Sequence, residues 1–186
     1  MNTHDELVDA ILADIGRTLR QVNADEVEAL LAALLRAERV FLAGKGRTGL
    51  QMRAFAMRLM HLGLRVHVVD DVTTPAIGAG DLLLIGSSSG RTGSLLRYVE
   101  TVGATGAQLA ALTGNLDSPI AAAATSCVYI PANFKAGAGA GAGSALVMGS
   151  LFEHCLGLLC DLLIIRLKAA LGVDEARMNA RHANLE

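Results

Sequence analysis

Five short apolar runs, separated by helical stretches or turn clusters, constrain the fold of this chain more than any other feature. They span residues 40–43, 66–69, 82–85, 109–112 and 128–130. Short strands that alternate with helices pair in parallel, because each parallel crossover needs a helix-length connection. The sequence therefore predicts an α/β fold. We expect a three-layer α-β-α sandwich whose five-stranded parallel sheet has the flavodoxin-like order 2-1-3-4-5.

Helices are predicted on both sides of this core. Apolar residues recur at helical spacing in residues 3–20, and Asn23 and Glu26 resemble a capping box for a second helix. A long apolar helix is expected over about 144–171 and a short one over 174–182. We expect residues 1–186 to form a single domain. Its parts are the N-terminal helices 1–37, the sheet core 38–131, a flexible Ala/Gly loop 132–143 and the C-terminal helices 144–186.

Composition excludes several classes of partner. The net charge is −2 and no basic run occurs, which argues against nucleic acid. Charged residues interrupt the apolar segment 145–167, which argues against a membrane span. The three cysteines form no C-x-x-C pair and the first residues do not resemble a signal peptide, so we expect a cytoplasmic protein. Since 52% of the residues are hydrophobic, we expect apolar surface to be buried in a homo-oligomer.

Two glycine-rich loops follow the first and third apolar runs. The first, GKGRTG, contains Gly46, Arg47 and Thr48 and matches the G-x-G-x-x-G fingerprint of dinucleotide sites. The second, GSSSGRTGS, carries five hydroxyl residues before a helix, and its spacing aims Ser87, Ser89 and Thr92 at one point, with Ser88 between them. Such a loop binds an anion at a helix N-terminus; the alternative is ordinary N-capping.

In the predicted strand order the two loops flank one crevice, at the point where the order of the strands reverses. The serine-rich loop occupies space that the second half of a dinucleotide would need. We therefore expect the crevice to hold a compact monophosphate, with Thr48 and either Arg47 or Lys45 closing on it from the other side. Asp70 and Asp71 then become solvated residues at a strand end. The Ala/Gly tract at 136–143 is either a lid beside this site or a tolerated linker.

The chain resembles the SIS (sugar isomerase) domain, and more closely the 6-phospho-3-hexuloisomerase family. The resemblance is carried by AFAMRLMHLG, TTPAIGAGDLLLIGSSSG, MGSLFEH and RHANLE, and it spans nearly the whole chain. Lys45, Thr48, Ser88 and Arg91 depart from the residues usual in that family. The resemblance implies a homotetramer of the ribulose monophosphate pathway. It also implies interconversion of D-arabino-hex-3-ulose 6-phosphate and fructose 6-phosphate through a 2,3-enediol, with neither a metal nor a redox cofactor.

Enediol chemistry needs a general base, a proton shuttle between the oxygens and an anchor for the phosphate. Glu153 is our candidate base, because a carboxyl group among apolar neighbours suits proton transfer; the alternative is a structural ion pair, for which Arg58 is a candidate partner. His61 and His182 are candidate shuttles. The alternatives are a capping or core histidine for His61 and an exposed chain-end residue for His182, whose tail could reach a neighbouring subunit.

Three functions remain open from the sequence. The first is a ketose-phosphate isomerase or another sugar-phosphate isomerase. The second is a non-catalytic sugar-phosphate sensor, which Glu153 in the long helix and the absence of a basic helix disfavour. The third is a dinucleotide-dependent oxidoreductase, which the second, serine-rich loop disfavours.

Overall fold

A computed structural model of the chain describes residues 3–132 and 144–185. The predicted flexible loop and the Ala/Gly tract therefore lie outside the described residues, apart from Ala132. The elements, in chain order, are α1 (His4–Leu19), α2 (Ala24–Arg36), β1 (Val40–Ala43), α3 (Gly46–Leu62), β2 (Val66–Val68), β3 (Leu82–Ser87), α4 (Gly93–Thr105), β4 (Gln108–Thr113), α5 (Pro119–Ala123), β5 (Ser126–Tyr129), α6 (Ser150–Leu171) and α7 (Glu175–Ala180).

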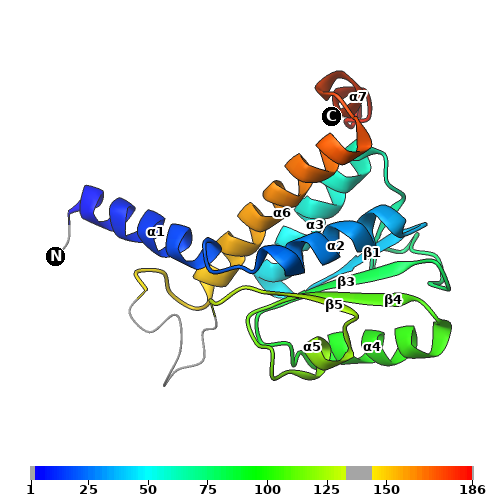
Figure 1. The fold of residues 1–186 in the computed structure, drawn as a ribbon, viewed down its shortest axis with the longest axis horizontal. Helices are drawn as coiled ribbons and strands as arrows, with labels where there is room; N and C mark the ends of the chain where they lie inside the picture. The colour runs from blue at the N-terminus through cyan, green and yellow to red at the C-terminus, as the bar shows by residue number, and fades with distance from the viewer. Residues whose placement is uncertain (1–2, 133–143, 186) are drawn as a thin grey trace.

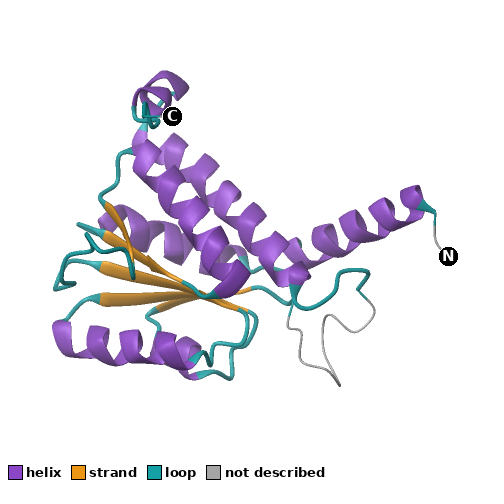
Figure 2. Cartoon of the chain, turned by 180° about the vertical axis from the view of Figure 1, so that it is seen from behind, coloured by secondary structure: helices purple, strands orange, loops and turns teal. Residues whose placement is uncertain are grey.

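The sheet has the predicted order. Its five strands run β2-β1-β3-β4-β5, and each neighbouring pair is parallel. Figure 1 shows α4 and α5 on one face of the sheet and α2, α3 and α6 on the other, so the three-layer α-β-α sandwich is confirmed. Figure 2 shows the same layers from behind, with α1 extending away from the rest of the described chain.

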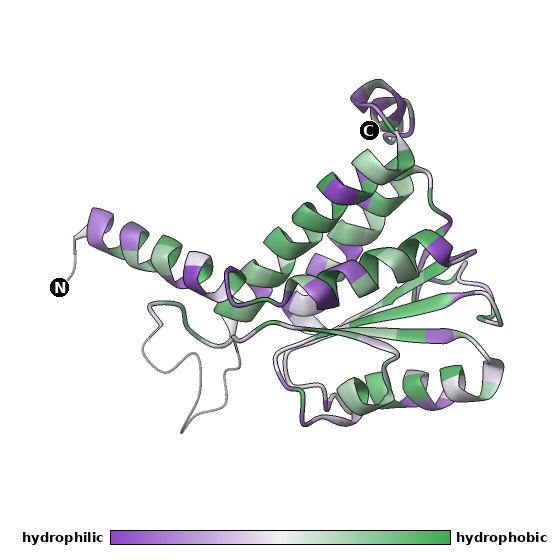
Figure 3. Ribbon diagram, viewed as in Figure 1, coloured by the Kyte–Doolittle hydropathy of each residue, from purple (hydrophilic) through white to green (hydrophobic). Residues whose placement is uncertain are grey.

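Strands β1, β3, β4 and β5 each contribute side chains to two hydrophobic cores, one on each face of the sheet. Val40 and Leu42 pack with α2, α3 and α6, whereas Phe41 and Ala43 of the same strand pack with α4 and α5. Both faces are covered, so the central strands are apolar along most of their length instead of alternating (Figure 3). This explains why continuous apolar runs, rather than alternation, marked the strands in the sequence.

The N-terminal helices differ from the prediction in one detail. Thr3 and Glu6 form a capping box at α1. At α2, Asn23 caps the helix by accepting a hydrogen bond from the Asp25 amide, but the capping box predicted with Glu26 is wrong. The Glu26 carboxylate instead accepts a hydrogen bond of 2.8 Å from the Tyr129 amide and so ties α2 to the edge strand β5.

The long helix begins later than predicted. Helix α6 starts at Ser150, because Met148 (φ 52°) and Gly149 (φ 81°) both have left-handed backbone conformations. Such conformations interrupt a right-handed helix and are costly for a residue with a Cβ such as Met148. The result is that the first turn of α6 lies next to the carboxyl ends of β1 and β3. No helix in the described parts of the chain is long and apolar enough to cross a membrane.

Candidate active site

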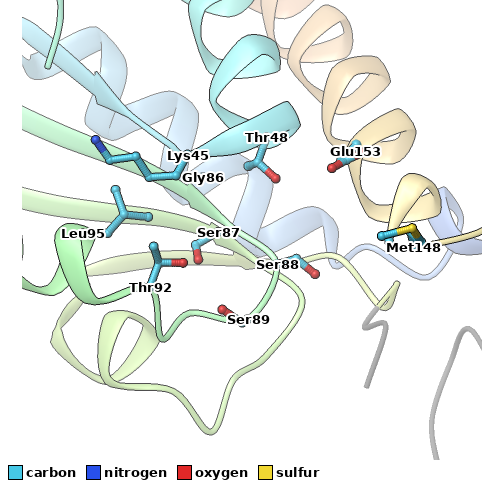
Figure 4. Close-up of a pocket in the computed structure, with 11 residues that line it drawn as sticks. Lys45, Thr48, Gly86, Ser87, Ser88, Ser89, Thr92, Leu95, Met148 and Glu153 are labelled. Atoms are coloured by element: carbon cyan, nitrogen blue, oxygen red, sulfur yellow. The ribbon is translucent and has the colours of Figure 1, made fainter. Parts of the chain in front are cut away.

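A cavity of about 370 Å³ lies at the carboxyl ends of β1 and β3, where the strand order reverses. Ligands of open α/β sheets bind at this position. Figure 4 shows that the side chains around the cavity come from the two predicted loops and from the start of α6. The lining residues are Lys45, Thr48, Gly86, Ser87, Ser88, Ser89, Thr92, Leu95, Met148, Gly149 and Glu153.

The glycines of the first loop serve backbone packing. A Cβ on Gly49 would lie 2.7 Å from the carbonyl oxygen of Gly44, and Gly46 has a φ of 58°. The fingerprint spacing therefore brings the end of β1 against the first turn of α3, as it does in dinucleotide sites, without requiring a dinucleotide. Thr48 lines the cavity, but Gly46 and Arg47 are not among the residues that line it within the described chain.

The hydroxyl groups of the second loop are arranged to donate. Thr92 occupies the N-cap position of α4, yet its side chain makes no capping hydrogen bond. Ser87 Oγ accepts from the Gly90 amide at 3.1 Å, and Ser89 Oγ accepts from the Arg91 amide at 3.2 Å. A hydroxyl that accepts in this way still has its proton to donate. The N-capping alternative is therefore wrong for Thr92, and the loop suits an anion.

The helix termini around the cavity favour negative charge as well. Helices α3 and α4 begin at the cavity, and neither has an acidic residue in its first turn. By contrast, α1, α2 and α7 each carry acidic residues there. The free amides at the starts of α3 and α4 are thus left for a ligand, and the positive ends of both helix dipoles lie at the same place.

Glu153 lies opposite the serine loop, in the first turn of α6, and its side chain is 14% exposed. Figure 4 shows it across the cavity from Ser87 and Ser88. Arg47 Nε is 2.7 Å from Glu153 Oε2. The geometry of this ion pair does not make a hydrogen bond, so the buried Oε2 accepts none from the described residues. Arg47, not Arg58, is the partner of Glu153, so the sequence-based choice of Arg58 was wrong.

Arg47, which the sequence suggested as a phosphate ligand, therefore pairs with Glu153, the candidate base. Arg47 also donates to Ser150 Oγ at 3.3 Å, which joins the first turns of α3 and α6. Its side chain is 60% exposed, and the guanidinium carries the only charge within salt-bridge distance of Glu153 among the described residues. Arg47 holds this carboxylate at Oε2 while Glu153 lines the cavity, so the carboxylate can accept a proton from a ligand there.

The two candidate histidines lie together but away from this cavity. The rings of His61 and His182 are stacked with 5.2 Å between their centroids, at the far end of α3. Burial, followed by the charges of His182 and Arg58, lowers the pKa of His61. His61 lies thirteen positions after Thr48 on one helix, a distance of about 20 Å along its axis. Within one chain neither ring reaches the ligand.

Lys45 is hydrogen-bonded in a polar cluster with Asp70 and Tyr98, which the sequence did not predict. Its Nζ donates to Asp70 Oδ2 at 2.5 Å and to the Tyr98 hydroxyl at 3.3 Å, while that hydroxyl donates to Asp70 Oδ1. The pKa of Asp70 is lowered, mainly by Lys45 and then by Tyr98. Asp71 pairs with Arg53. Both aspartates are therefore ion-paired, rather than solvated alone as expected.

Sequence reasoning also missed the apolar part of the cavity wall. Leu95 and Met148 line it, and so does the backbone at Gly149. Leu95 lies in the first turn of α4, directly after the serine loop, so helical geometry could have placed it there. Met148 and Gly149 both have left-handed backbone conformations before α6. In the sequence, only the glycine at position 149 indicated such a conformation.

Comparison with known proteins shows that residues 33–155 match the SIS domain. The chain belongs to the SIS domain family. It is 43% identical over 173 residues to the 3-hexulose-6-phosphate isomerase of Mycobacterium gastri, covering 93% of this chain and 86% of the relative. It is 36% identical to the enzyme of the same name from Bacillus subtilis, covering 97% of this chain and 98% of the relative.

A solved structure from this family has the same fold. The Methanococcus jannaschii protein, whose inferred molecular function is 3-hexulose-6-phosphate isomerase, superposes with a TM-score of 0.81 at 29% identity and covers 98% of each chain. The predicted membership of the SIS family and the predicted kinship with this group of isomerases are thus confirmed.

Proposed function

We propose that this protein is a 3-hexulose-6-phosphate isomerase that interconverts D-arabino-hex-3-ulose 6-phosphate and fructose 6-phosphate. The observation that carries the proposal is the placement of Glu153, which lines the same cavity as the serine loop while Arg47 holds its carboxylate at Oε2. Enzymes of this name from two bacteria align with nearly the whole chain, which supports the same substrate class. The corresponding pathway is formaldehyde assimilation through ribulose monophosphate.

The serine loop anchors the phosphate in this proposal. Ser87, Ser89 and Thr92 donate their hydroxyl protons to the phosphate oxygens, and Ser88 and Thr48 complete the lining. The amides at the start of α4 add the favourable end of the helix dipole. Anchoring at this end fixes the sugar carbons beside α6, and fixing reacting groups in place lowers the entropic part of the barrier.

Glu153 then acts as the general base. It removes the C2 proton of the 3-ketose, and the electron pair forms a C2–C3 double bond while the carbonyl oxygen at C3 takes up a proton. The resulting 2,3-enediol loses the proton of its C2 hydroxyl, and C3 receives a proton, so that the carbonyl now lies at C2. No atom or electron is gained or lost overall. Positioned acid–base groups of this kind contribute factors of about 10² to 10⁴.

Neither of the candidate histidines for the proton shuttle between the oxygens lines the cavity within the described residues of one chain. We propose that the His61–His182 pair of a second subunit approaches the cavity in a homo-oligomer, for which we expect a tetramer. Exposed apolar side chains on α6, namely Leu158, Leu162 and Ile165, support such an assembly. Free cysteines, two of them buried, are consistent with a cytoplasmic location. Light scattering of the purified protein tests the assembly.

A direct assay separates this proposal from a non-catalytic sensor. The protein is mixed with D-arabino-hex-3-ulose 6-phosphate, and fructose 6-phosphate is measured over time. Formation of fructose 6-phosphate supports the isomerase. Binding of fructose 6-phosphate in a thermal-shift experiment without any turnover would instead favour a sensor, and stabilisation by NAD alone would favour an oxidoreductase.

A further inference from the structure

A short segment at the carboxyl end of β4, residues 113–115, packs against the serine loop and binds its backbone. Thr113 Oγ1 donates to the Ser87 carbonyl at 2.8 Å. The Gly114 amide donates to the Ser88 carbonyl at 3.1 Å, and Asn115 Nδ2 donates to the Ser89 carbonyl at 3.1 Å. Three consecutive carbonyl oxygens of the serine loop are therefore held by three consecutive residues of another strand end.

These hydrogen bonds, together with the one that the Gly90 amide donates to the Ser87 carbonyl at 3.2 Å, fix which way the peptide groups of the serine loop face. In a trans peptide the carbonyl and the following amide point in opposite directions, and the described chain contains no cis peptide. The carbonyls of Ser87 and Ser88 point toward residues 113–115, so the amides of Ser88 and Ser89 point away from them. None of the described residues accepts a hydrogen bond from either amide, and both residues line the cavity.

The supporting segment is itself fixed. Asn115 Oδ1 accepts from the Asp117 amide at 3.1 Å, and the Asn115 carbonyl accepts from Ser118 Oγ at 2.7 Å. Thr113 is fully buried. A Cβ on Gly90 would lie 3.3 Å from Thr113 Oγ1 and 2.0 Å from Ser118 Oγ, so the serine loop fits closely against this segment and against the serine that fixes it. The segment therefore acts as a rigid template, not as a second mobile loop.

We propose that Thr113 and Asn115 are positioning residues for the phosphate, which hold the Ser87, Ser88 and Ser89 carbonyls away from the cavity so that the loop presents only donors to the anion. The identity of the anion as a sugar phosphate rests on the proposed function. Without the template, the peptide groups can rotate and turn a carbonyl toward the phosphate, where the two negative ends repel each other. Neither side chain touches the ligand, and both act through the loop.

Matched threonine variants test the proposal. Thr113→Val removes the hydroxyl at nearly constant volume, and Thr113→Ser restores it. Thr125→Val is the control, because Thr125 Oγ1 donates to the Leu109 carbonyl at 2.9 Å, a bond of the same kind at the opposite end of β4. Asn115→Ala removes the other side-chain donor at a less buried position. It decides the question if Thr113→Val does not fold.

The readouts are the dissociation constant of inorganic phosphate by calorimetry, and the KM and kcat for the hexulose phosphate. Thr113→Val and Asn115→Ala should each weaken phosphate binding and raise KM by about tenfold, with kcat within about threefold because Glu153 is untouched. Thr113→Ser should restore binding, and Thr125→Val should affect only stability.

Unchanged phosphate affinity in folded Thr113→Val or Asn115→Ala would overturn the proposal. So would a loss of kcat at constant KM, or an equal loss of affinity in Thr125→Val. Wild-type protein that binds no phosphate would also overturn it. Wild-type protein that binds phosphate but does not isomerise the hexulose phosphate would contradict only the proposed function, because the phosphate measurement does not depend on turnover.

Discussion

Arg47 Nε lies 2.7 Å from Glu153 Oε2, so the first turn of α3 holds the carboxylate of α6 in place beside the cavity. Arg47 also bonds to Ser150 Oγ and does not line the cavity. This relationship distinguishes two roles for the arginine: a phosphate ligand affects substrate binding, whereas a partner of the base affects the chemical step.

Replacing Arg47 with methionine tests which role it has. Arg47→Met keeps much of the apolar stem but removes the charge, so the carboxylate loses the group that orients it. We expect kcat to fall by about tenfold with KM nearly unchanged, because a mobile base is a poorer base. Steady-state kinetics measures both constants. A large rise in KM at normal kcat would show that Arg47 binds the phosphate instead.

Thr92 provides a test of the anion site that is separate from helix stability. Its hydroxyl makes no capping bond, so Thr92→Val should leave the melting temperature nearly unchanged. Loss of a hydrogen bond to a charged phosphate should raise KM by about tenfold to a hundredfold. Thr92→Ser keeps the hydroxyl and should behave like the wild type. If Thr92→Val lowers the melting temperature without changing KM, Thr92 caps α4 and does not bind the phosphate.

Lys45 lines the cavity, but we expect it to contribute little to phosphate affinity. Its ammonium is bound to Asp70 and Tyr98. The Lys45–Asp70 pair is well exposed, with 37% and 53% of the two side chains accessible, so Lys45→Met should cost less than about 1 kcal/mol of stability. Phosphate affinity should change by less than about threefold. Calorimetry that finds a much larger loss would mean that Lys45 leaves Asp70 to bind the ligand.

His61 makes a prediction about pH. Burial lowers its pKa from the usual 6.5, so the unfolded chain binds a proton more readily than the native one. The native state therefore loses stability as the pH falls from 6.5 toward the lowered pKa, and this stability is complete above 6.5. Urea unfolding above and below that pH should show the loss in the wild type and less of it in His61→Gln. An identical pH dependence in both proteins would contradict this.

Much of the fold was predictable because its signals are local. Each buried strand is a short apolar run that ends in glycine or a turn, and the loop chemistry after β1 and β3 placed the site at the point where the strand order reverses. The failures depend on contacts between distant residues. Glu26 bonds to Tyr129 rather than to its own helix cap. Glu153 pairs with Arg47 because two helices begin side by side, which spacing along the chain does not reveal.

The candidate site was predicted in part for the same reason. The serine loop directly follows β3, and Thr48 follows β1 within a few residues. The order of these strands could be inferred from the sequence, so the prediction correctly placed the loop and Thr48 together. The histidines lie at the far end of the helix that begins with the first loop, and that helix is seventeen residues long. Their separation from the cavity follows from helix length alone. The approach of a second subunit's histidines to the cavity is our proposal, and no local pattern in the sequence predicts it.

Turnover by the Glu153→Gln variant tests the central claim most directly, because glutamine keeps the shape of the side chain but cannot accept the C2 proton. With D-arabino-hex-3-ulose 6-phosphate as substrate, fructose 6-phosphate formation should fall by about a thousandfold, while calorimetry still finds fructose 6-phosphate bound with near wild-type affinity. Near-normal turnover in that variant would contradict the account.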